Sequence, residues 1–289
     1  MRVSSASSPS RISKAASGRA NRRRLPHAVS RAQRLDLELV RRGLVRSRSE
    51  AKQVIDEGKV KVKGMPLAGP ASLVREDAAI TLTEARRFVS RGGDKLDGAL
   101  ERLGIEVTGR RWLDAGASTG GFTDRLLQGG AAGVVAVDVG YGQLDWGLRN
   151  DPRVTVLERQ NIRLIEASRL PWVPEGVVAD LSFISLAKVL PDLARMVSPD
   201  ADFLLLVKPQ FEAGREFVGK GGVVRDPAVW LDSLRKVAAA GRTLDLGVAG
   251  ATRSEPPGPA GNREFFLHLR RGVAAAEAVM EWAVGEVST

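Results

Sequence analysis

Near the beginning of the chain the apolar residues change from a helical to an alternating period. A first helix is predicted from Arg34 to a stop at Gly43. Ser47, with Glu50 three residues later, forms a capping box that opens a second helix, which ends at Gly58. The residues that these two helices are expected to bury are Leu35, Leu39, Val40, Ala51, Val54 and Ile55.

A short basic strand is predicted directly after the second helix. Val60 and Val62 alternate with three lysines, so the apolar and basic side chains point to opposite faces. A solvated strand face would show the same pattern, but more basic residues surround this one. We expect this surface to contact nucleic-acid phosphates through Arg34, Arg41, Arg42, Arg46, Arg48, Lys52, Lys59, Lys61 and Lys63.

The net charge of +10 is concentrated at the N-terminal end. Residues 1–35 hold nine Lys and Arg and no acid, whereas residues 86–289 hold 26 of each sign. Residues 1–28 are rich in Ser, Arg and Ala without an apolar period, so we predict a disordered basic arm. A transit peptide of the same composition is the alternative.

The remainder of the chain alternates short apolar runs with amphipathic stretches. This order predicts an α/β domain with a mostly parallel sheet covered on both faces. The predicted strands are 111–116, 133–139, 153–157, 176–181, 202–207, 247–252 and 263–269. The predicted helices between them are 93–104, 120–129, 184–197 and 227–241. Residues 255–262 are too few for a helical crossover, so the last two strands should pair antiparallel.

These patterns predict two domains behind the arm. A small α+β domain is expected at 29–83, a linker at 84–89 and the large α/β domain at 90–289. No apolar run is long enough for a membrane span or a signal peptide, so we expect a cytoplasmic protein without a membrane partner. The chain has no cysteine and only two histidines, which excludes disulfides and thiolate metal sites and disfavours any metal.

A glycine turn after the first large-domain strand is the candidate cofactor site. "WLDAGASTGGFTDRLL" has the spacing G-x-x-x-G-G, whereas a dinucleotide site favours G-x-G-x-x-G. Asp138 ends the next strand, where an acid meets the ribose hydroxyls of a bound nucleoside. The combination indicates S-adenosylmethionine. Its predicted contacts are Asp114, Gly116, Ala117, Ser118, Gly120, Gly121, Phe122, Asp138, Asn161 and Asp180.

Four further polar residues fall at one rim of the predicted sheet. Lys95 lies in "SRGGDKL" before the first strand, Asp180 ends the fourth strand and Lys208 follows the fifth. Glu264 begins the last strand, and an antiparallel strand starts at the rim where parallel strands end. We therefore expect these four side chains to converge. Taken singly, each could equally be a strand-end cap or a surface residue.

Both predicted domains resemble known families. "RLDLELVRRGLVRSRSEAKQVIDEGKVKVKG" resembles the RNA-binding domain of the ribosomal protein S4 family. Lys95, Asp180, Lys208 and Glu264 stand in the order of the tetrad of FtsJ-like ribose 2′-O-methyltransferases, which are class I, Rossmann-like enzymes. Together with "FVSRGGDKL", "LDAGASTGGFTD", "VKPQFE" and "GNREFF", the chain is similar to the TlyA family. A tryptophan is often found in that family's linker, where this chain has Arg87-Phe88-Val89.

The resemblance implies methylation of cytidine 2′-hydroxyls in 16S and also 23S ribosomal RNA, with the 30S and 50S subunits as partners. It assigns catalysis to Lys95, Asp180, Lys208 and Glu264, with Lys208 engaging the hydroxyl. A ribose hydroxyl is a poor nucleophile at neutral pH. It must be held in line with the methyl group and must lose its proton, which a partly desolvated lysine beside a second cation can accept.

Other readings of the sequence stay open. Arg91 and Gln210 are candidate RNA contacts, although surface roles fit equally well. Base amino-group methylation would favour a proline-containing motif after the fourth strand, where this chain has Asp180-Leu181-Ser182-Phe183. A haemolysin or pore-forming protein is a second alternative, because that label is attached to the family. The third is a ribosome-binding factor without catalysis.

Overall fold

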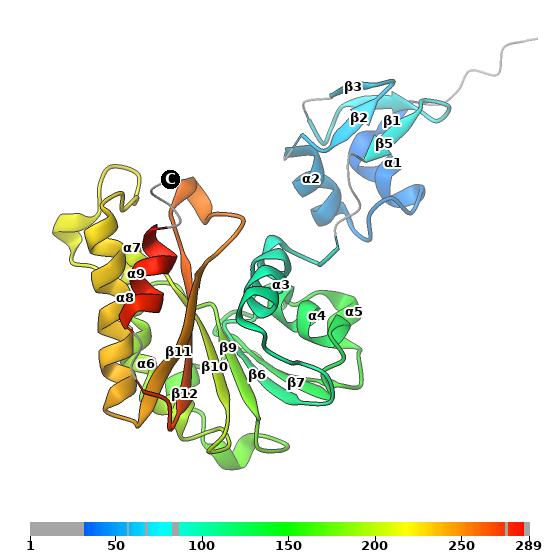
Figure 1. Ribbon diagram of the computed structural model, residues 1–289. Coiled ribbons are helices and arrows are strands. Elements are labelled where there is room, and N and C mark those ends of the chain that lie inside the picture. The colour runs from blue at the N-terminus through cyan, green and yellow to red at the C-terminus, as the bar shows by residue number, and fades with distance from the viewer. Residues whose placement is uncertain (1–31, 57, 67–68, 83–86, 275–276, 286–289) are drawn as a thin grey trace, which may run out of the picture. The chain divides into compact units, whose positions relative to one another are not determined.

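The chain divides into two compact units, Met1–Ala85 and Arg86–Thr289 (Figure 1). The computed structural model describes residues 32–56, 58–66, 69–82, 87–274 and 277–285. The arm predicted at 1–28 lies outside these residues.

The first unit is a small α+β domain, as predicted. Its two helices, α1 and α2, contribute Leu35, Leu39, Ala51, Val54 and Ile55 to one buried cluster. Of the residues expected inside, only Val40 is partly exposed. The elements are β1 (Ala32–Arg34), α1 (Leu35–Arg41), α2 (Arg48–Asp56), β2 (Val60–Val62), β3 (Met65–Pro66), β4 (Leu73–Arg75) and β5 (Ile80–Leu82).

The sequence placed the start of the first helix one residue too early. Arg34 belongs to β1, which pairs antiparallel with β4 through Leu73. The capping box of α2 is half formed, because the Glu50 amide donates to Ser47 Oγ at 3.2 Å. The Glu50 carboxylate accepts from the amide of Arg46 instead of that of Ser47.

The second unit is built on a seven-stranded sheet with the order β11-β12-β10-β9-β6-β7-β8. Neighbouring strands from β10 to β8 run parallel, whereas β12 runs antiparallel to both β10 and β11, as the short connection predicted. The strands are β6 (Arg111–Ala115), β7 (Gly133–Val137), β8 (Val154–Leu157), β9 (Gly176–Ala179), β10 (Asp202–Val207), β11 (Leu246–Arg253) and β12 (Phe265–Arg271).

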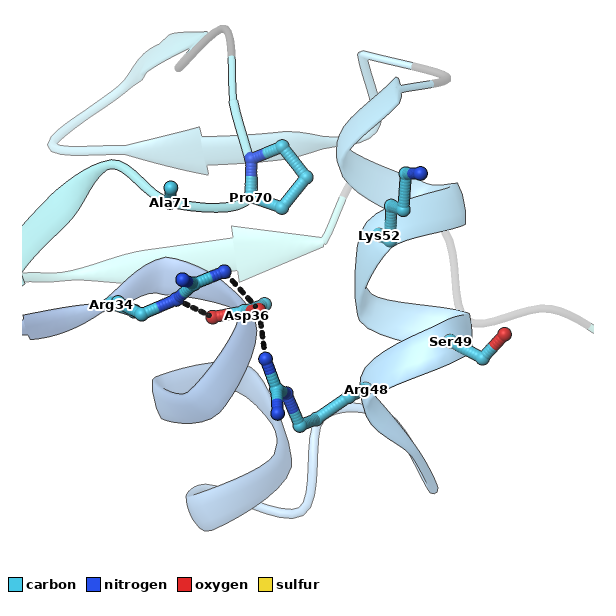
Figure 2. A pocket seen from close by; sticks show the side chains of 7 residues that line it. All are labelled: Arg34, Asp36, Arg48, Ser49, Lys52, Pro70 and Ala71. Atoms are coloured by element: carbon cyan, nitrogen blue, oxygen red, sulfur yellow. Dashed lines mark hydrogen bonds and ion pairs between the residues drawn. The ribbon is translucent and has the colours of Figure 1, made fainter.

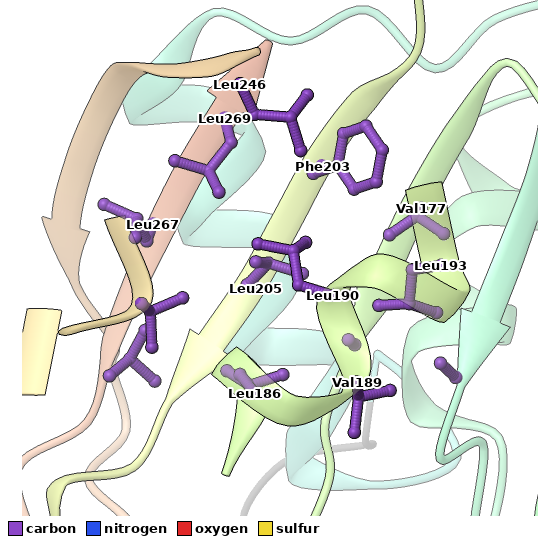
Figure 3. Packing of buried hydrophobic residues seen from close by; sticks show 14 of the residues in the cluster. Val177, Leu186, Val189, Leu190, Leu193, Phe203, Leu205, Leu246, Leu267 and Leu269 are labelled. Carbon is purple, nitrogen blue, oxygen red and sulfur yellow. The ribbon is translucent and has the colours of Figure 1, made fainter. Parts of the chain in front are cut away.

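Helices cover both faces of this sheet, because successive strand residues point to opposite sides. Trp112 belongs to the buried cluster with residues of α3 and α4, whereas its neighbour Leu113 belongs to the cluster with residues of α6 and α8. Figure 1 shows these two pairs of helices on opposite faces of the sheet. Figure 3 shows the layer on the α6 side, where α6 lies over β9 and β10 and the leucines of β12 join the same cluster. The helices are α3 (Arg91–Leu103), α4 (Gly121–Gln128), α5 (Trp146–Arg149), α6 (Leu186–Ala194), α7 (Pro209–Glu212), α8 (Pro227–Arg242) and α9 (Glu277–Gly285).

Part of the segment expected as a linker is anchored on the second unit. Residues 84–86 lie outside the described residues. Phe88 is only 4% exposed, the amide of Val89 donates to Asp124 Oδ2 at 2.8 Å, and Arg87 pairs with Asp97. Residues 87–89 therefore pack as the beginning of this unit, because Phe88 carries an apolar ring that needs burial.

Candidate active site

The glycine turn lies where β6 ends and brings two strand ends into contact. Gly116 has a φ of 88°. A Cβ there would stand 2.5 Å from the carbonyl oxygen of Asp180, so a larger residue would push the turn away from the end of β9. The amides of Gly116 and Ala117 both donate to the Val137 carbonyl oxygen, which fixes the turn against β7.

Asp138 follows β7 and faces a cavity of about 470 Å³. The amides of Ser118 and Gly140 donate to its two carboxylate oxygens at 2.8 and 2.6 Å. These bonds hold the carboxylate at the cavity wall, ready to accept from hydroxyl groups. Five of the ten predicted cofactor contacts line this cavity: Gly116, Ser118, Asp138, Asn161 and Asp180.

Asp114 lies beneath the turn and is fully buried. Its Oδ2 accepts from Thr123 Oγ1 at 2.6 Å, while Oδ1 has no partner among the described residues. Burial raises the pKa of Asp114 to about 7, and the nearby charges of Asp180 and Asp138 add to this rise. An unpartnered buried oxygen beside the cavity fits a cofactor that brings an amine.

The other four predicted contacts do not line the cavity. Ala117 is buried, and Gly120 turns the chain into α4 with a φ of 96°. A Cβ on Gly121 would lie 2.2 Å from Ser90 Oγ, so this glycine allows α4 to approach the start of α3. Phe122 packs against Phe266 with ring centroids 5.8 Å apart. These four residues form and support the glycine turn without lining the cavity.

The four tetrad residues form two ion pairs at the predicted rim. Lys95 Nζ lies 2.5 Å from Glu264 Oε2, and both side chains are almost fully buried. Lys208 pairs with Asp180 and also donates to Ser182 Oγ at 3.1 Å. The second ion pair is the more exposed one.

A second cavity of about 410 Å³ lies beside the first one and connects the two ion pairs. Both Lys208 and Glu264 line it, and it shares Ser182 and Phe183 with the cofactor cavity. Glu264 Oε1 has no partner among the described residues. The arrangement places a lysine and a carboxylate within reach of one small polar group.

The sequence missed several residues that line these cavities. Phe183 is 91% exposed, has a φ of 65° and contacts the ring of Phe211 at 5.1 Å. The run "ADLSFIS" does not mark this aromatic residue as exposed; the usable signal was its position, three residues after Asp180 at the end of a strand. Gln143, Gln160 and Ser182 also line the 470 Å³ cavity. Gln210, which the sequence offered as a candidate RNA contact, lines the second cavity.

The basic surface of the first unit includes a shallow pocket of about 460 Å³. Arg34 and Arg48 both bond to Asp36, and Lys52 lies at the same pocket (Figure 2). The hydrogen bond from Arg34 is the main reason that the pKa of Asp36 falls to about 2. Three cations against one carboxylate leave the pocket positive, which suits a phosphate.

Two of the predicted RNA contacts serve the fold of this unit. Arg41 and Arg42 both donate to the buried carboxylate of Glu38. Arg42 also donates to the carbonyl oxygens of Glu76 and Ala78. Lys52, Lys61, Lys63 and Arg46 have exposed side chains and Lys59 is half-buried, while Arg91 is exposed at the start of α3.

Two negative findings apply to the described part of the chain. No three His, Cys, Asp or Glu side chains there are grouped so as to hold a metal ion. No helix there combines the length and the apolar character needed to cross a bilayer.

Comparisons with known proteins agree with this architecture. The model of the FtsJ-like methyltransferase family matches residues 88–271, and that of the S4 domain matches residues 33–80. The 16S/23S rRNA (cytidine-2′-O)-methyltransferase TlyA of Mycobacterium tuberculosis is 54% identical over 84% of this chain and 91% of its own length.

Two further relatives carry a different name. Hemolysin A of Brachyspira hyodysenteriae is 38% identical over 82% of this chain and 99% of its own length. A solved structure from Streptococcus thermophilus, also named a hemolysin, is 36% identical, has a TM-score of 0.71 and covers 90% of this chain and 96% of its own. The chain belongs to the FtsJ-like methyltransferase family and carries an S4 domain before the methyltransferase domain.

Proposed function

We propose that this chain transfers a methyl group from S-adenosylmethionine to the ribose 2′-hydroxyl of cytidine in ribosomal RNA. The observation that carries the proposal is the pair of lysine–carboxylate contacts beside a nucleoside-sized cavity. The name of the Mycobacterium tuberculosis relative supports both the RNA class and the nucleoside. The substrates are the 16S RNA of the 30S subunit and the 23S RNA of the 50S subunit, and the enzyme acts in the cytoplasm.

The cofactor cavity contains suitable groups for each part of S-adenosylmethionine. Asp138 would accept from the ribose hydroxyls, and Asn161 would contact the adenine at the same wall. Asp114, with one oxygen unpartnered, would orient the amine directly or through water. The cofactor would supply an electrophilic methyl group, and the cofactor's sulfur would leave as a neutral thioether.

The tetrad would position the hydroxyl and remove its proton. Lys208 Nζ, held by Asp180 and Ser182, would first release a proton to solvent. The neutral amine would then accept the proton of the ribose hydroxyl as the new C–O bond forms. The ammonium then stays paired with Asp180 until the proton passes to solvent. Glu264 lines the same cavity as Lys208, and Lys95, its buried partner, would supply the second cation.

The S4 domain would hold the RNA through its phosphates. The pocket around Arg34, Arg48 and Lys52 is suited to one phosphate group, and Lys61 and Lys63 extend the positive surface. Arg91 would contribute from the methyltransferase domain. Arg41 and Arg42 would act indirectly, because Glu38 occupies their guanidinium groups.

The first test is methyl transfer from tritium-labelled S-adenosylmethionine to purified 30S and 50S subunits. We expect label in the RNA at a site that resists alkaline cleavage. Lys208→Ala should lower the rate by about 100-fold or more, because proton removal and positioning are both lost. It should still bind S-adenosylmethionine. Lys188→Ala, which removes an exposed lysine from α6, is the matched control.

Two outcomes would contradict the proposal. Label that stays alkali-sensitive, or that is found on a base, would assign the reaction to base methylation. Full activity of Lys208→Ala would remove the tetrad from the mechanism and favour a ribosome-binding factor. The name hemolysin adds no separate candidate function, since both relatives that carry it match this chain over most of its length.

A further inference from the structure

The loops that follow β9 and β10 touch at three successive levels. Lys208 contacts Asp180 and Ser182 at the first level. The rings of Phe183 and Phe211 make a tilted contact at the second level, with centroids 5.1 Å apart. The third level is formed by Glu212, which ends α7 and reaches back to the start of α6. Three separate contacts therefore join the two segments.

Glu212 makes this last contact with both carboxylate oxygens. Oε1 accepts from the amide of Leu186 at 2.6 Å, and Oε2 accepts from Ser185 Oγ at 2.5 Å. The side chain of Glu212 is 1% exposed. Burial raises the pKa of Glu212, and the bonds from Ser185 and Leu186 oppose that rise. Burying a carboxylate costs free energy unless hydrogen bonds and a nearby cation compensate for the lost hydration.

Glu212 replaces the usual cap of α6. Ser185 occupies the N-cap position but makes no side-chain cap bond of its own, because its hydroxyl donates to Glu212. The carboxylate instead satisfies the first helical amide and lies where the helix dipole favours negative charge. Lys236 of α8 contributes the nearest cation, 3.7 Å from Oε2.

The spacing along the chain links this cap to the reacting groups. Glu212 lies only four positions after Lys208, and Ser185 only five positions after Asp180. A shift of either loop at the third level would move Lys208 relative to Asp180, because so short a span cannot absorb it. Glu212 itself lines neither cavity, so it acts through these loops and not on the substrate.

We propose that Glu212 is a positioning residue for methyl transfer: by joining the α7 turn to the N-terminus of α6, it sets the place of Lys208 against Asp180. This role rests on the proposed function of Lys208. Its structural part, the bridge between the two loops, stands independently of that function.

The experiment compares Glu212→Ala and Glu212→Gln in the full chain. The glutamine can still accept from Leu186 and can donate to Ser185, so it keeps the bridge without the charge. We expect Glu212→Ala to lower kcat by about 10- to 100-fold, the range that a misplaced catalytic group produces, while the Kd for S-adenosylmethionine changes less than about twofold. Glu212→Gln should recover most of kcat.

Asp202→Asn is the matched control, because Asp202 is a buried carboxylate at the opposite end of β10. This variant should lose stability without losing kcat per folded molecule. Hydrogen–deuterium exchange of residues 183–189 and 209–213 should rise in Glu212→Ala only. That readout needs no RNA, so it tests the bridge even if the wild-type enzyme methylates neither subunit.

Three results would overturn the inference. Glu212→Ala with unchanged kcat would show that the bridge does not position Lys208. Equal losses of kcat and of cofactor affinity would assign Glu212 to the fold of the whole domain. Unchanged exchange in the two segments would mean that the loops do not depend on this carboxylate.

Discussion

Among single residues, Asp114 shows most directly how burial changes the pKa of a side chain at the site. Its carboxyl group is fully buried and its pKa is raised to about 7, chiefly by the loss of hydration. In the unfolded chain its pKa would be the ordinary aspartate value of 3.8. Between these two values the folded protein holds a proton that the unfolded chain has released, so stability falls as pH rises through this window.

The first prediction follows from this window. The free energy of unfolding of the wild type, relative to Asp114→Asn, should fall by about 2–3 kcal/mol between pH 5 and pH 8. Asparagine fills the same space without a titrating proton, so it removes this dependence. Urea denaturation of both proteins at the two pH values measures the effect. Parallel pH profiles would mean that Asp114 titrates near its ordinary value.

Residue identity alone could not reveal the partners inside the site. The sequence predicted that Lys95, Asp180, Lys208 and Glu264 would converge, because their places on the strands fix the rim. It gave no indication that Lys95 would pair with Glu264 and Lys208 with Asp180, since that choice depends on packing around each side chain.

At the scale of elements, helix α1 has two buried carboxylates, and Glu38 is the more deeply buried of them. Glu38 is inaccessible to solvent and accepts from both Arg41 and Arg42. Bonding to Arg41 is the main reason that its pKa falls to about 2. Because this folded pKa lies below the unfolded value, the stability that Glu38 contributes is present above about pH 4.5 and is lost as pH falls toward 2.

The second prediction concerns this helix. Glu38→Gln should destabilise the S4 domain by roughly 2–3 kcal/mol at pH 7, because charge-assisted hydrogen bonds are lost. Hydrogen exchange of the α1 amides in the full chain measures the change. Asp56→Asn, at the exposed end of α2, is the control and should have little effect. Equal changes of hydrogen exchange in both variants would mean that Glu38 does not stabilise α1 more than an exposed carboxylate does.

Element boundaries show where sequence patterns reach their limit. The strands predicted at 111–116 and 133–139 end one and two residues early, as β6 and β7. The reason at the first site is that Gly116 turns with a positive φ, which no strand adopts. Helices α5 and α7 escaped prediction, because four residues each are too few to show a period.

For the whole molecule, charge and catalysis occupy different units. Residues 1–85 hold 18 basic and eight acidic residues, which accounts for the entire net charge of +10. The second unit is neutral and has two large buried clusters of its own. RNA affinity and cofactor affinity should therefore be separable.

The third prediction tests this separation. Removing residues 1–85 should lower RNA affinity by about tenfold or more and flatten its salt dependence, since phosphate contacts are lost. The Kd for S-adenosylmethionine should change less than about twofold. Calorimetry for the cofactor and filter binding for the RNA at two salt concentrations measure both. An equal loss of the two affinities would show that the units depend on each other.

The antiparallel course of β12 also bears on how the enzyme is made. Lys95 and Glu264 are 169 positions apart, and β12 lies between β10 and β11. During synthesis, a chain whose last strand has not yet been made has a gap in the sheet between β10 and β11. Lys95 then lacks its partner Glu264. Closing that gap is a late, long-range step of folding. A nascent chain therefore acquires its complete set of four tetrad side chains only near the end of its synthesis.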